Sequence, residues 1–249
     1  MSKIVDQLGF ELDIPIKPLR IVSLVPSQTE LLFDLGLDNS IVGVTKFCIH
    51  PERAKSKTSV GGTKNFKFDI IESLHPDLII GNKEENYENG IVLLRKNYPV
   101  WMSDIFSLDD ALSMIRSIGE ITSRQAKSSE IIDVINNEFK TLKPFSSRRC
   151  LYLIWKKPWM AAGKNTFIDS MLSKISLINC LDAQRYPELS DRDIVSLSPE
   201  VILLSSEPYP FKENHIQELK TLVPTAQVVL VDGELFSWYG SRLVKSPAY

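Results

Sequence analysis

A fourteen-residue segment occurs twice in this chain of 249 residues. Residues 71–84 read IESLHPDLIIGNKE and residues 194–207 read IVSLSPEVILLSSE, and they align without a gap at an offset of 123. In each copy a helical pattern stops at a proline and an apolar strand follows. Repeats of about 20–50 residues would indicate a solenoid, whereas one recurrence at half the chain length indicates duplication of a lobe. Chance similarity between two βα units is the alternative.

Apolar segments alternate with amphipathic ones on both sides of this repeat. Strands are predicted at 20–25, 41–45, 77–81, 99–103, 150–155, 200–205 and 226–232. Helices are predicted from Thr29 to Gly36 and at 69–75, 91–97, 166–175 and 192–198. Nearly all-apolar strands that alternate with helices predict parallel sheets covered on both faces.

Residues 107–143 interrupt this rhythm with helix-compatible sequence. Ser107-x-x-Asp110 and Thr122-x-x-Gln125 are candidate capping boxes for two helices, and Pro144 would end the second. An apolar stripe marks the second helix, formed by Ile131, Ile132, Ile135, Phe139 and Leu142. The predicted fold is α/β: two similar lobes with mainly parallel sheets joined by one long backbone helix. The predicted boundaries are 1–121, including an amphipathic lead-in, 122–143 for the helix, and 144–249.

Composition excludes several classes of protein. With 29 basic and 31 acidic residues and a formal charge of −2, the chain has no clustered basic surface for a nucleic acid. No stretch approaches about 18 uninterrupted apolar residues, so no membrane span is predicted. Three dispersed cysteines form no disulfide framework. The first residues lack the basic and apolar regions of a signal peptide.

Ser27, in the stretch VPSQTELLFDLGL, admits two interpretations. A nucleophile elbow has small residues on both sides of its serine, but Val25 and Thr29 occupy those positions here. Ser27-x-x-Glu30 fits a capping box instead, in which the hydroxyl accepts from the N3 amide and the carboxylate reaches back. We therefore predict that Ser27 caps a helix and is not a nucleophile. A triad assembled in space from distant residues remains the alternative.

The loops that follow the predicted strands are rich in polar and aromatic residues. They read KFCIHPE (46–52), GGTKNFK (61–67), NKEENYENG (82–90), WKKPWMAAGKN (155–165), SSEPYPF (205–211) and DGELFSWYGSR (233–242). Three of the four tryptophans lie in them. Ligands of open α/β sheets bind beyond the carboxyl ends of the strands, so these loops predict a ligand-binding surface. Arg242 is included because its guanidinium can bind a carboxylate or phosphate through two parallel hydrogen bonds.

Together these segments resemble a known family, the substrate-binding proteins of ABC importers for cobalamin and ferric siderophores, also called helical-backbone metal receptors. The resemblance covers roughly residues 19 to 245 and is carried by RIVSLVPSQTELLFDLGL, GGTKNFKFDIIESLHPDLII, the long helix and AAGKNTFIDSML…YPELSDRDIVSLSPEVILL. It is strongest to the cobalamin-binding branch. It implies a class III periplasmic-binding-protein fold, with a metal chelate held between two lobes and acidic residues that dock onto a permease.

The resemblance also implies roles for individual residues. The ligand would contact Pro26, Ser27, Thr29, Thr63 and Lys64 in the first lobe, and Trp159, Tyr186, Trp238 and Tyr239 in the second. Asp69 matches a docking acid of the first lobe. Arg192 stands near the place where the second lobe should carry its acid, so Asp191 or Asp193 would substitute.

Two further residues suggest a contact with the metal of a chelate. Cys48-x-His50 could supply a thiolate and an imidazole as lower ligands to cobalt or iron. The alternative is a buried cysteine and a loop histidine without that role, because a metal site of the protein's own needs more than two donors.

The sequence therefore predicts a monomeric binding protein, not an enzyme, whose ligand is cobalamin, a related corrinoid, haem or a ferric siderophore. It would have no cofactor of its own and would deliver the chelate to an ABC permease or handle it inside the cell. Members of the family are usually periplasmic or lipid-anchored, whereas the missing signal and the start MSKI favour a cytoplasmic location. The alternative is a cytoplasmic hydrolase or corrinoid-processing enzyme that uses Ser27, His50 or Glu84.

Overall fold

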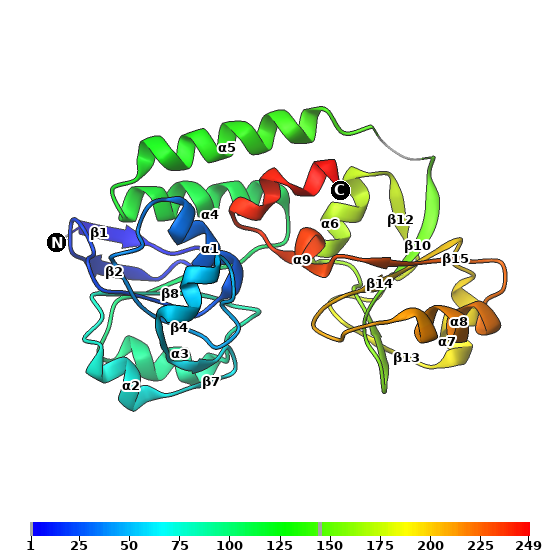
Figure 1. Ribbon diagram of the computed structural model, residues 1–249, viewed down its shortest axis with the longest axis horizontal. Helices are drawn as coiled ribbons and strands as arrows, with labels where there is room; N and C mark the ends of the chain where they lie inside the picture. Colours follow the sequence, from blue (N-terminus) through cyan, green and yellow to red (C-terminus); the bar gives the residue numbers. More distant parts are fainter. Residues whose placement is uncertain (1, 144–145) are drawn as a thin grey trace. The chain divides into compact units, whose positions relative to one another are not determined.

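The structure, a computed structural model, describes residues 2–143 and 146–249. The chain forms two compact α/β units whose segments interleave along the sequence (Figure 1). Unit 1 consists of Met1–Ile105, Asp109–Asn137 and Tyr239–Val244, and unit 2 of Phe106–Leu108, Glu138–Trp238 and Lys245–Tyr249. Residues 239–244 therefore pack with unit 1, although the predicted boundaries put them in the C-terminal lobe.

A five-stranded parallel sheet forms the centre of unit 1. Its strands, in spatial order, are β5 (Thr58–Ser59), β4 (Ile41–Val44), β3 (Ile21–Ser23), β8 (Leu78–Asn82) and β9 (Val100–Ser103). The connections contain α1 (Pro26–Asp34), η1 (Glu52–Ser56), the hairpin β6 (Gly61–Gly62) and β7 (Asn65–Phe66), α2 (Phe68–Ser73) and α3 (Glu88–Arg95). Every residue of β3 and β8 is buried, as expected for a parallel sheet covered on both faces.

An antiparallel hairpin of β1 (Ser2–Val5) and β2 (Glu11–Ile14) precedes this sheet, where only an amphipathic lead-in was predicted. Its turn depends on Asp6, whose carboxylate accepts hydrogen bonds from the backbone N–H groups of Leu8 and Phe10 at 2.9 Å each. Arg95 on α3 donates to the same carboxylate at 2.6 Å. The strands themselves are mostly exposed, so no apolar alternation marks them in the sequence.

Helices α4 (Leu108–Ile121) and α5 (Gln125–Lys140) lie side by side (Figure 1). They approach closely because Gly119 has no side chain: a Cβ atom there would lie 2.0 Å from Ser128 Oγ. Helix α4 starts directly after Ser107, the residue predicted to cap it. The prediction for Thr122 is wrong, because its hydroxyl donates to the Ile118 carbonyl at 2.6 Å and so belongs to the end of α4. Pro144 lies outside the described residues.

Unit 2 contains a mixed sheet in which the central strands are parallel. Its strands, in spatial order, are β13 (Glu188–Leu189), β11 (Trp159–Ala161), β10 (Arg148–Trp155), β14 (Val201–Ser205) and β15 (Gln227–Val231), with β12 (Leu177–Asn179) also paired to β10. Strand β11 pairs antiparallel with both of its neighbours, β10 and β13. The helices are α6 (Phe167–Lys174), α7 (Asp191–Leu197), α8 (Glu213–Leu222) and α9 (Gly233–Ser237), followed by η2 (Ser241–Val244) in unit 1 and η3 (Ser246–Ala248).

Side chains of β14 alternate between two cores in unit 2. Ile202 and Leu204 pack with residues of α7 and α8, whereas Val201 and Leu203 pack with residues of α6. This alternation follows from the period of two residues in a strand. The predicted class, two α/β lobes with mainly parallel sheets, is confirmed.

The sequence repeat corresponds to a structural repeat. Strands β8 and β14 begin and end at the same offset of 123 residues. The residues before the two prolines, His75 and Ser198, both have left-handed backbone conformations, with φ of 44° and 46°. In addition, Arg20 and Arg149 at the starts of the central strands donate to the equivalent carbonyls of Leu74 and Leu197. Shared hydrogen bonds of this kind favour duplication over chance similarity.

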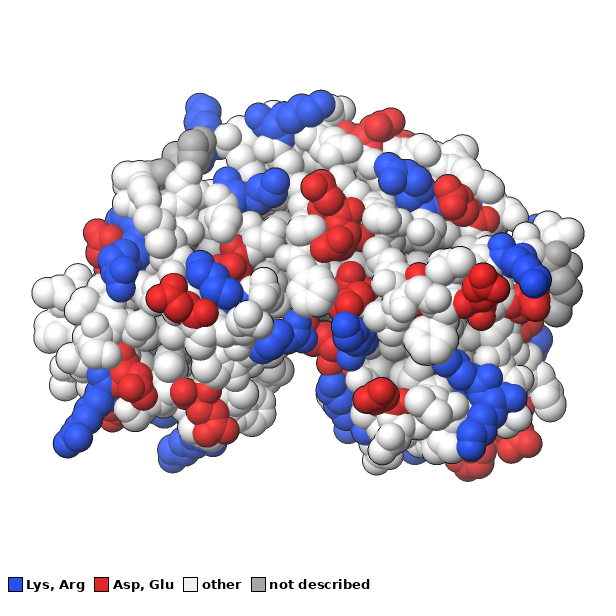
Figure 2. Space-filling model, turned by 180° about the vertical axis from the view of Figure 1, so that it is seen from behind, with Lys and Arg blue, Asp and Glu red and all other residues white. Residues whose placement is uncertain are grey.

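Two surface properties can be stated for the described residues. No helix among them is both long enough and apolar enough to cross a lipid bilayer. On the face shown in Figure 2, basic and acidic side chains are mixed.

Candidate functional site at the carboxyl ends of the strands

Three buried polar residues stand where strands of unit 1 end: Ser23 in β3, Asn82 in β8 and Ser103 in β9. Gln28, in the first turn of α1, donates through Nε2 to Ser103 Oγ at 2.8 Å and to the Gly81 carbonyl at 3.2 Å. Asn82 Nδ2 donates to the same hydroxyl at 2.9 Å. These bonds hold the start of α1 against the strand ends, which is where ligands of open α/β sheets bind.

Ser27 does not cap α1, contrary to the prediction. The helix begins at Pro26, two residues earlier than a cap at Ser27 would allow, because a proline suits the first helical position, where its missing N–H is not needed. The N-cap is therefore Val25, without a side-chain cap. Ser27 is 3% exposed, and no described residue hydrogen-bonds its Oγ. A serine nucleophile needs a base within hydrogen-bond reach, and no described residue offers one to Ser27.

Glu30, the other half of the predicted capping box, pairs with Arg242 instead. Arg242 Nε and Nη2 each donate to one carboxylate oxygen of Glu30 at 2.8 Å, and both residues are buried. The guanidinium was predicted to reach a ligand, but this bidentate pair engages it within unit 1. Ser241 donates to Asp34 on the same helix. Gly240 completes the contact, because a Cβ atom there would lie 2.4 Å from the Ser27 carbonyl oxygen.

Cys48 is buried next to α1. Its sulfur lies 3.1 Å from Thr29 Oγ1 and 3.2 Å from Thr45 Oγ1. Burial raises the pKa of this thiol above its ordinary value, so Cys48 stays protonated and is a poor metal ligand. His50 is half-buried on the following loop. Within residues 2–143 and 146–249, no three His, Cys, Asp or Glu side chains gather closely enough to hold a metal ion.

The other predicted residues of unit 1 lie on two loops that hydrogen bonds join. Asn86 Nδ2 donates to the Thr63 carbonyl at 3.0 Å and to the Leu24 carbonyl at 3.3 Å. Lys64 Nζ donates to the Glu84 carbonyl. The structure thus brings Ser27, Thr29, Thr63 and Lys64 to the same end of the unit 1 sheet.

Sequence reasoning missed Phe47 and Ile49, which are exposed by 50% and 42% on the loop after β4. Cys48 between them is buried, and Lys46 Nζ lies 4.9 Å from the centre of the Phe47 ring. Alternation of apolar side chains between inside and outside is a strand-like signal that also applies to this loop. Apolar groups exposed at the carboxyl ends of strands are candidate ligand contacts.

Trp159 in unit 2 belongs to the core and not to a ligand-facing wall, contrary to the prediction. It is stacked with Phe211 at a centroid distance of 6.2 Å, and its indole N–H donates to Asp191 at 2.8 Å. The chain reverses after β10 and pairs back as β11, which turns the ring inward. The tryptophan at the carboxyl end of β10 is Trp155, which is 39% exposed and contacts Tyr209 edge to face at 5.5 Å.

Trp238 and Tyr239 are each 7% exposed. The indole N–H of Trp238 donates to Glu207 Oε1 at 2.9 Å, and Ser237 donates to the same atom at 3.1 Å. Burial raises the pKa of Glu207, and the nearby Glu234 and Asp232 add to this, whereas the two hydrogen bonds oppose it. A partly buried carboxyl group with a raised pKa therefore accepts from the indole of Trp238 at the carboxyl end of β14.

Tyr186 lies in a small aromatic and cationic cluster of unit 2. The Arg185 guanidinium carbon is 5.8 Å from the centre of the Tyr186 ring and 5.5 Å from that of Phe106. Both distances are within the range of cation–π attraction.

The three predicted docking acids are all exposed. Asp69 lies in the first turn of α2, and Asp191 and Asp193 lie in the first turn of α7. Asp193 forms a capping box with Ser190, whose hydrogen bonds lower the pKa of the Asp193 carboxyl. Asp191 accepts the hydrogen bond from Trp159 described above.

Comparison with known proteins agrees with this architecture. The ABC transporter substrate-binding lipoprotein YvrC of Bacillus subtilis (strain 168), itself described as uncharacterized, is 27% identical over 212 residues, which is 77% of this chain and 65% of that protein. The vitamin B12-binding protein of Yersinia pestis (strain Pestoides F) is 23% identical over 193 residues, covering 75% of this chain and 69% of that protein. The matched region therefore spans about two thirds of these relatives' length.

Solved structures show the same fold. The periplasmic haem-binding protein RhuT of Roseiflexus sp. RS-1 aligns with a TM-score of 0.81 and 21% identity over 92% of this chain and 94% of that one. The periplasmic vitamin B12-binding protein BtuF of Vibrio cholerae aligns with a TM-score of 0.76 and 20% identity over 94% and 95%. The profile of the periplasmic binding protein family matches residues 21–227. This chain belongs to the periplasmic binding protein family.

Proposed function

We propose that this chain binds a metal chelate of the corrinoid, haem or ferric siderophore class and delivers it to an ABC importer. The relatives named for vitamin B12 and haem support this ligand class. The observation that carries the proposal is that each unit has an exposed aromatic side chain at or just after the carboxyl end of a strand. Phe47 follows strand β4 of unit 1, and Trp155 ends strand β10 of unit 2. Large macrocycles and aromatic siderophores offer the flat, apolar faces that such rings bind.

Each unit supplies polar groups that are candidate contacts with the chelate. In unit 1 these are the buried hydroxyl of Ser27 at the positive end of α1, the Thr63 segment and the Lys64 ammonium group, with Pro26 and Thr29 behind them. In unit 2 they are the ring of Tyr186 and the Arg185 guanidinium beside it. Trp238 and Tyr239 would border the ligand, with the Trp238 indole held by Glu207. Arg242 is a positioning residue, because it holds α1 through Glu30.

The exposed acids would dock onto the permease. Asp69 and Asp193 occupy the first turns of α2 and α7, the two helices of the internal repeat. A pair of carboxylates on equivalent helices suits two basic pockets of a symmetric membrane partner.

Isothermal titration calorimetry with cyanocobalamin, haemin and ferric enterobactin, a siderophore with aromatic catecholate rings, tests the ligand class. We expect one of them to bind with a micromolar or lower Kd. Phe47→Ala and Trp155→Ala should each weaken that binding by about one to two decades, because each ring contributes packing worth a few kcal/mol at 1.4 kcal/mol per decade. Leu93→Ala on α3 and Val195→Ala on α7 are matched controls, since both residues are exposed in the second halves of their helices. Absence of binding by all three probes at micromolar protein would overturn the proposal.

A further inference from the structure

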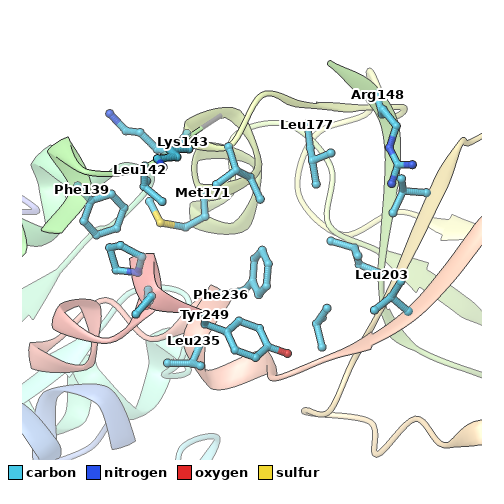
Figure 3. Close-up of a pocket in the computed structure, with 18 of the residues that line it drawn as sticks. Phe139, Leu142, Lys143, Arg148, Met171, Leu177, Leu203, Leu235, Phe236 and Tyr249 are labelled. Carbon is cyan, nitrogen blue, oxygen red and sulfur yellow. The ribbon is translucent and has the colours of Figure 1, made fainter. Parts of the chain in front are cut away.

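A cavity lies in unit 2, and none of the candidate-site residues described above lines it. Its volume is about 740 Å³, which falls within the range of small-molecule sites. The floor is the face of β14 and β15 that carries Val201, Leu203 and Val229, opposite the face covered by α7 and α8. Its walls come from the end of α5, from α6, from α9 and from the last residues of the chain (Figure 3).

The lining is mostly apolar with a few neutral polar residues, and its charged side chains are all basic. Three basic side chains border the cavity, Lys143, Arg148 and Lys174, and its described lining contains no Asp or Glu. The whole chain has 31 acidic and 29 basic residues, so its composition alone does not explain a lining whose charged side chains are all basic. Among the described residues, no carboxylate pairs with the ammonium groups of Lys143 and Lys174, and Arg148 donates only to the neutral Gln227 amide at 2.8 Å.

Two of the basic side chains lie on one side of the cavity, together with the apolar residues Leu142, Met171 and Leu177. Figure 3 shows Lys143 and Arg148 along one rim, with the rings of Phe236 and Tyr249 across the cavity from them. Phe236 packs on Tyr152 at a centroid distance of 5.3 Å, which fixes that wall. A ligand that is apolar over most of its length and anionic at one end matches this arrangement.

We propose that this cavity binds a single-chain carboxylic acid, such as a free fatty acid. The alkyl chain lies on Leu203, Val229 and Phe236, and the carboxylate lies at the basic rim of the cavity. This site is separate from the proposed chelate site, because none of the residues assigned to the chelate lines it.

Displacement of the fluorescent fatty acid cis-parinaric acid from the full chain tests the proposal. We expect saturable binding of the probe and displacement by dodecanoate at least tenfold more effective than by dodecyltrimethylammonium, which has the same tail and the opposite charge. Lys143→Glu combined with Lys174→Glu should weaken the binding of dodecanoate about tenfold. It should also reduce or reverse the preference for dodecanoate over dodecyltrimethylammonium. Val229→Trp, which fills the floor, should abolish binding of both amphiphiles.

Arg192→Glu combined with Lys220→Glu is the matched control, since both residues are exposed on α7 and α8 against the other face of the sheet and the change in net charge is the same. Thermal unfolding of every variant verifies that it is folded. Equal displacement by the two amphiphiles, or an equal effect of the control pair, would overturn the proposal. So would absence of probe binding by folded protein, binding only to anionic phospholipid vesicles, or self-association that Val229→Trp removes.

Discussion

At the scale of single residues, Glu30 and Arg242 form a buried ion pair within unit 1. Both side chains are about one-tenth exposed, at 11% and 10%. Removing one partner of such a pair leaves an uncompensated charge, whereas replacing both with apolar residues is much less costly. We expect Arg242→Leu to lower the free energy of unfolding by about 3–5 kcal/mol. The double variant Glu30→Leu/Arg242→Leu should lose less stability than Arg242→Leu alone. Urea denaturation measures the free energy of unfolding of both variants.

The exposed pair of Lys83 and Asp104 in the same unit is the control, since its lysine is 57% exposed. Lys83→Ala should change the free energy of unfolding by about 1 kcal/mol or less. A double Leu variant that is less stable than Arg242→Leu alone would show that burial of the pair is not the source of the loss.

Glu207 predicts a pH dependence of stability in unit 2. Burial raises its pKa in the folded protein above the ordinary value of 4.5. Below that value the group is protonated in both states, and as pH rises the unfolded chain loses the proton first, so stability falls until the folded pKa is passed. Glu207→Gln stays neutral and keeps an acceptor for Trp238 and Ser237. The free energy of unfolding of Glu207→Gln minus that of the original chain should therefore be larger at about pH 7 than at about pH 4.

Urea denaturation of both proteins at the two pH values measures this difference. Asp193→Asn is the contrasting variant, because hydrogen bonds from Ser190 lower the pKa of that carboxyl. Its effect should have the opposite sign: the free energy of unfolding of the original chain should increase relative to that of Asp193→Asn as pH rises. An identical pH profile for the original chain and Glu207→Gln would contradict the role of burial at Glu207.

At the scale of elements, the repeated helix–proline–strand unit has a costly residue at the same place in both copies. His75 and Ser198 adopt left-handed conformations, with φ of 44° and 46°, which suit glycine much better than residues with a Cβ atom. His75→Gly and Ser198→Gly should each raise the free energy of unfolding by about 0.5–1 kcal/mol. Ser198→Ala, which keeps the Cβ atom, should give no such gain. Two glycine variants less stable than the original chain by thermal unfolding would contradict this.

The elements that could be predicted from sequence are those with a continuous apolar run between clear stop signals. The strands expected at 77–81 and 200–205 occur as β8 and β14, shifted by at most one residue, because each follows a helix that a proline ends. The hairpin of β1 and β2 was missed because hydrogen bonds to Asp6 define its turn, and no apolar period accompanies them.

Site residues were harder to predict than strands, because the direction in which a side chain points depends on how neighbouring segments pack. Trp159 turns into the core only because β11 pairs back on β10, and nothing in the local sequence shows this pairing. Ser27 was predicted as the cap but lies in the first turn of α1, because Pro26 can itself start the helix. The partner of Arg242 lies 212 positions away along the chain, beyond any local pattern.

At the scale of the whole molecule, the units do not follow the chain order. Helix α9 and Trp238 belong to unit 2, Tyr239–Val244 belongs to unit 1, and Lys245–Tyr249 belongs to unit 2 again. A short segment near the end of the chain therefore contributes to the stability of the first unit. Its buried residues are Tyr239, Gly240, Ser241, Arg242 and Leu243.

Two truncations separate these contributions. A chain that ends at Trp238 loses the whole segment and leaves the Glu30 and Asp34 carboxylates without Arg242 and Ser241. Because an unpaired buried charge is costly, we expect the amide protons of α1 to exchange at least tenfold faster with solvent than in the full chain. A chain that ends at Val244 keeps both pairs and loses only residues of unit 2, including Tyr249, whose hydroxyl accepts from the Asp232 N–H at 2.9 Å. In this control the exchange of α1 should stay as in the full chain, and faster exchange should be confined to β15 and α9. Equal protection of α1 in the two truncated chains would show that Tyr239–Val244 does not stabilise unit 1.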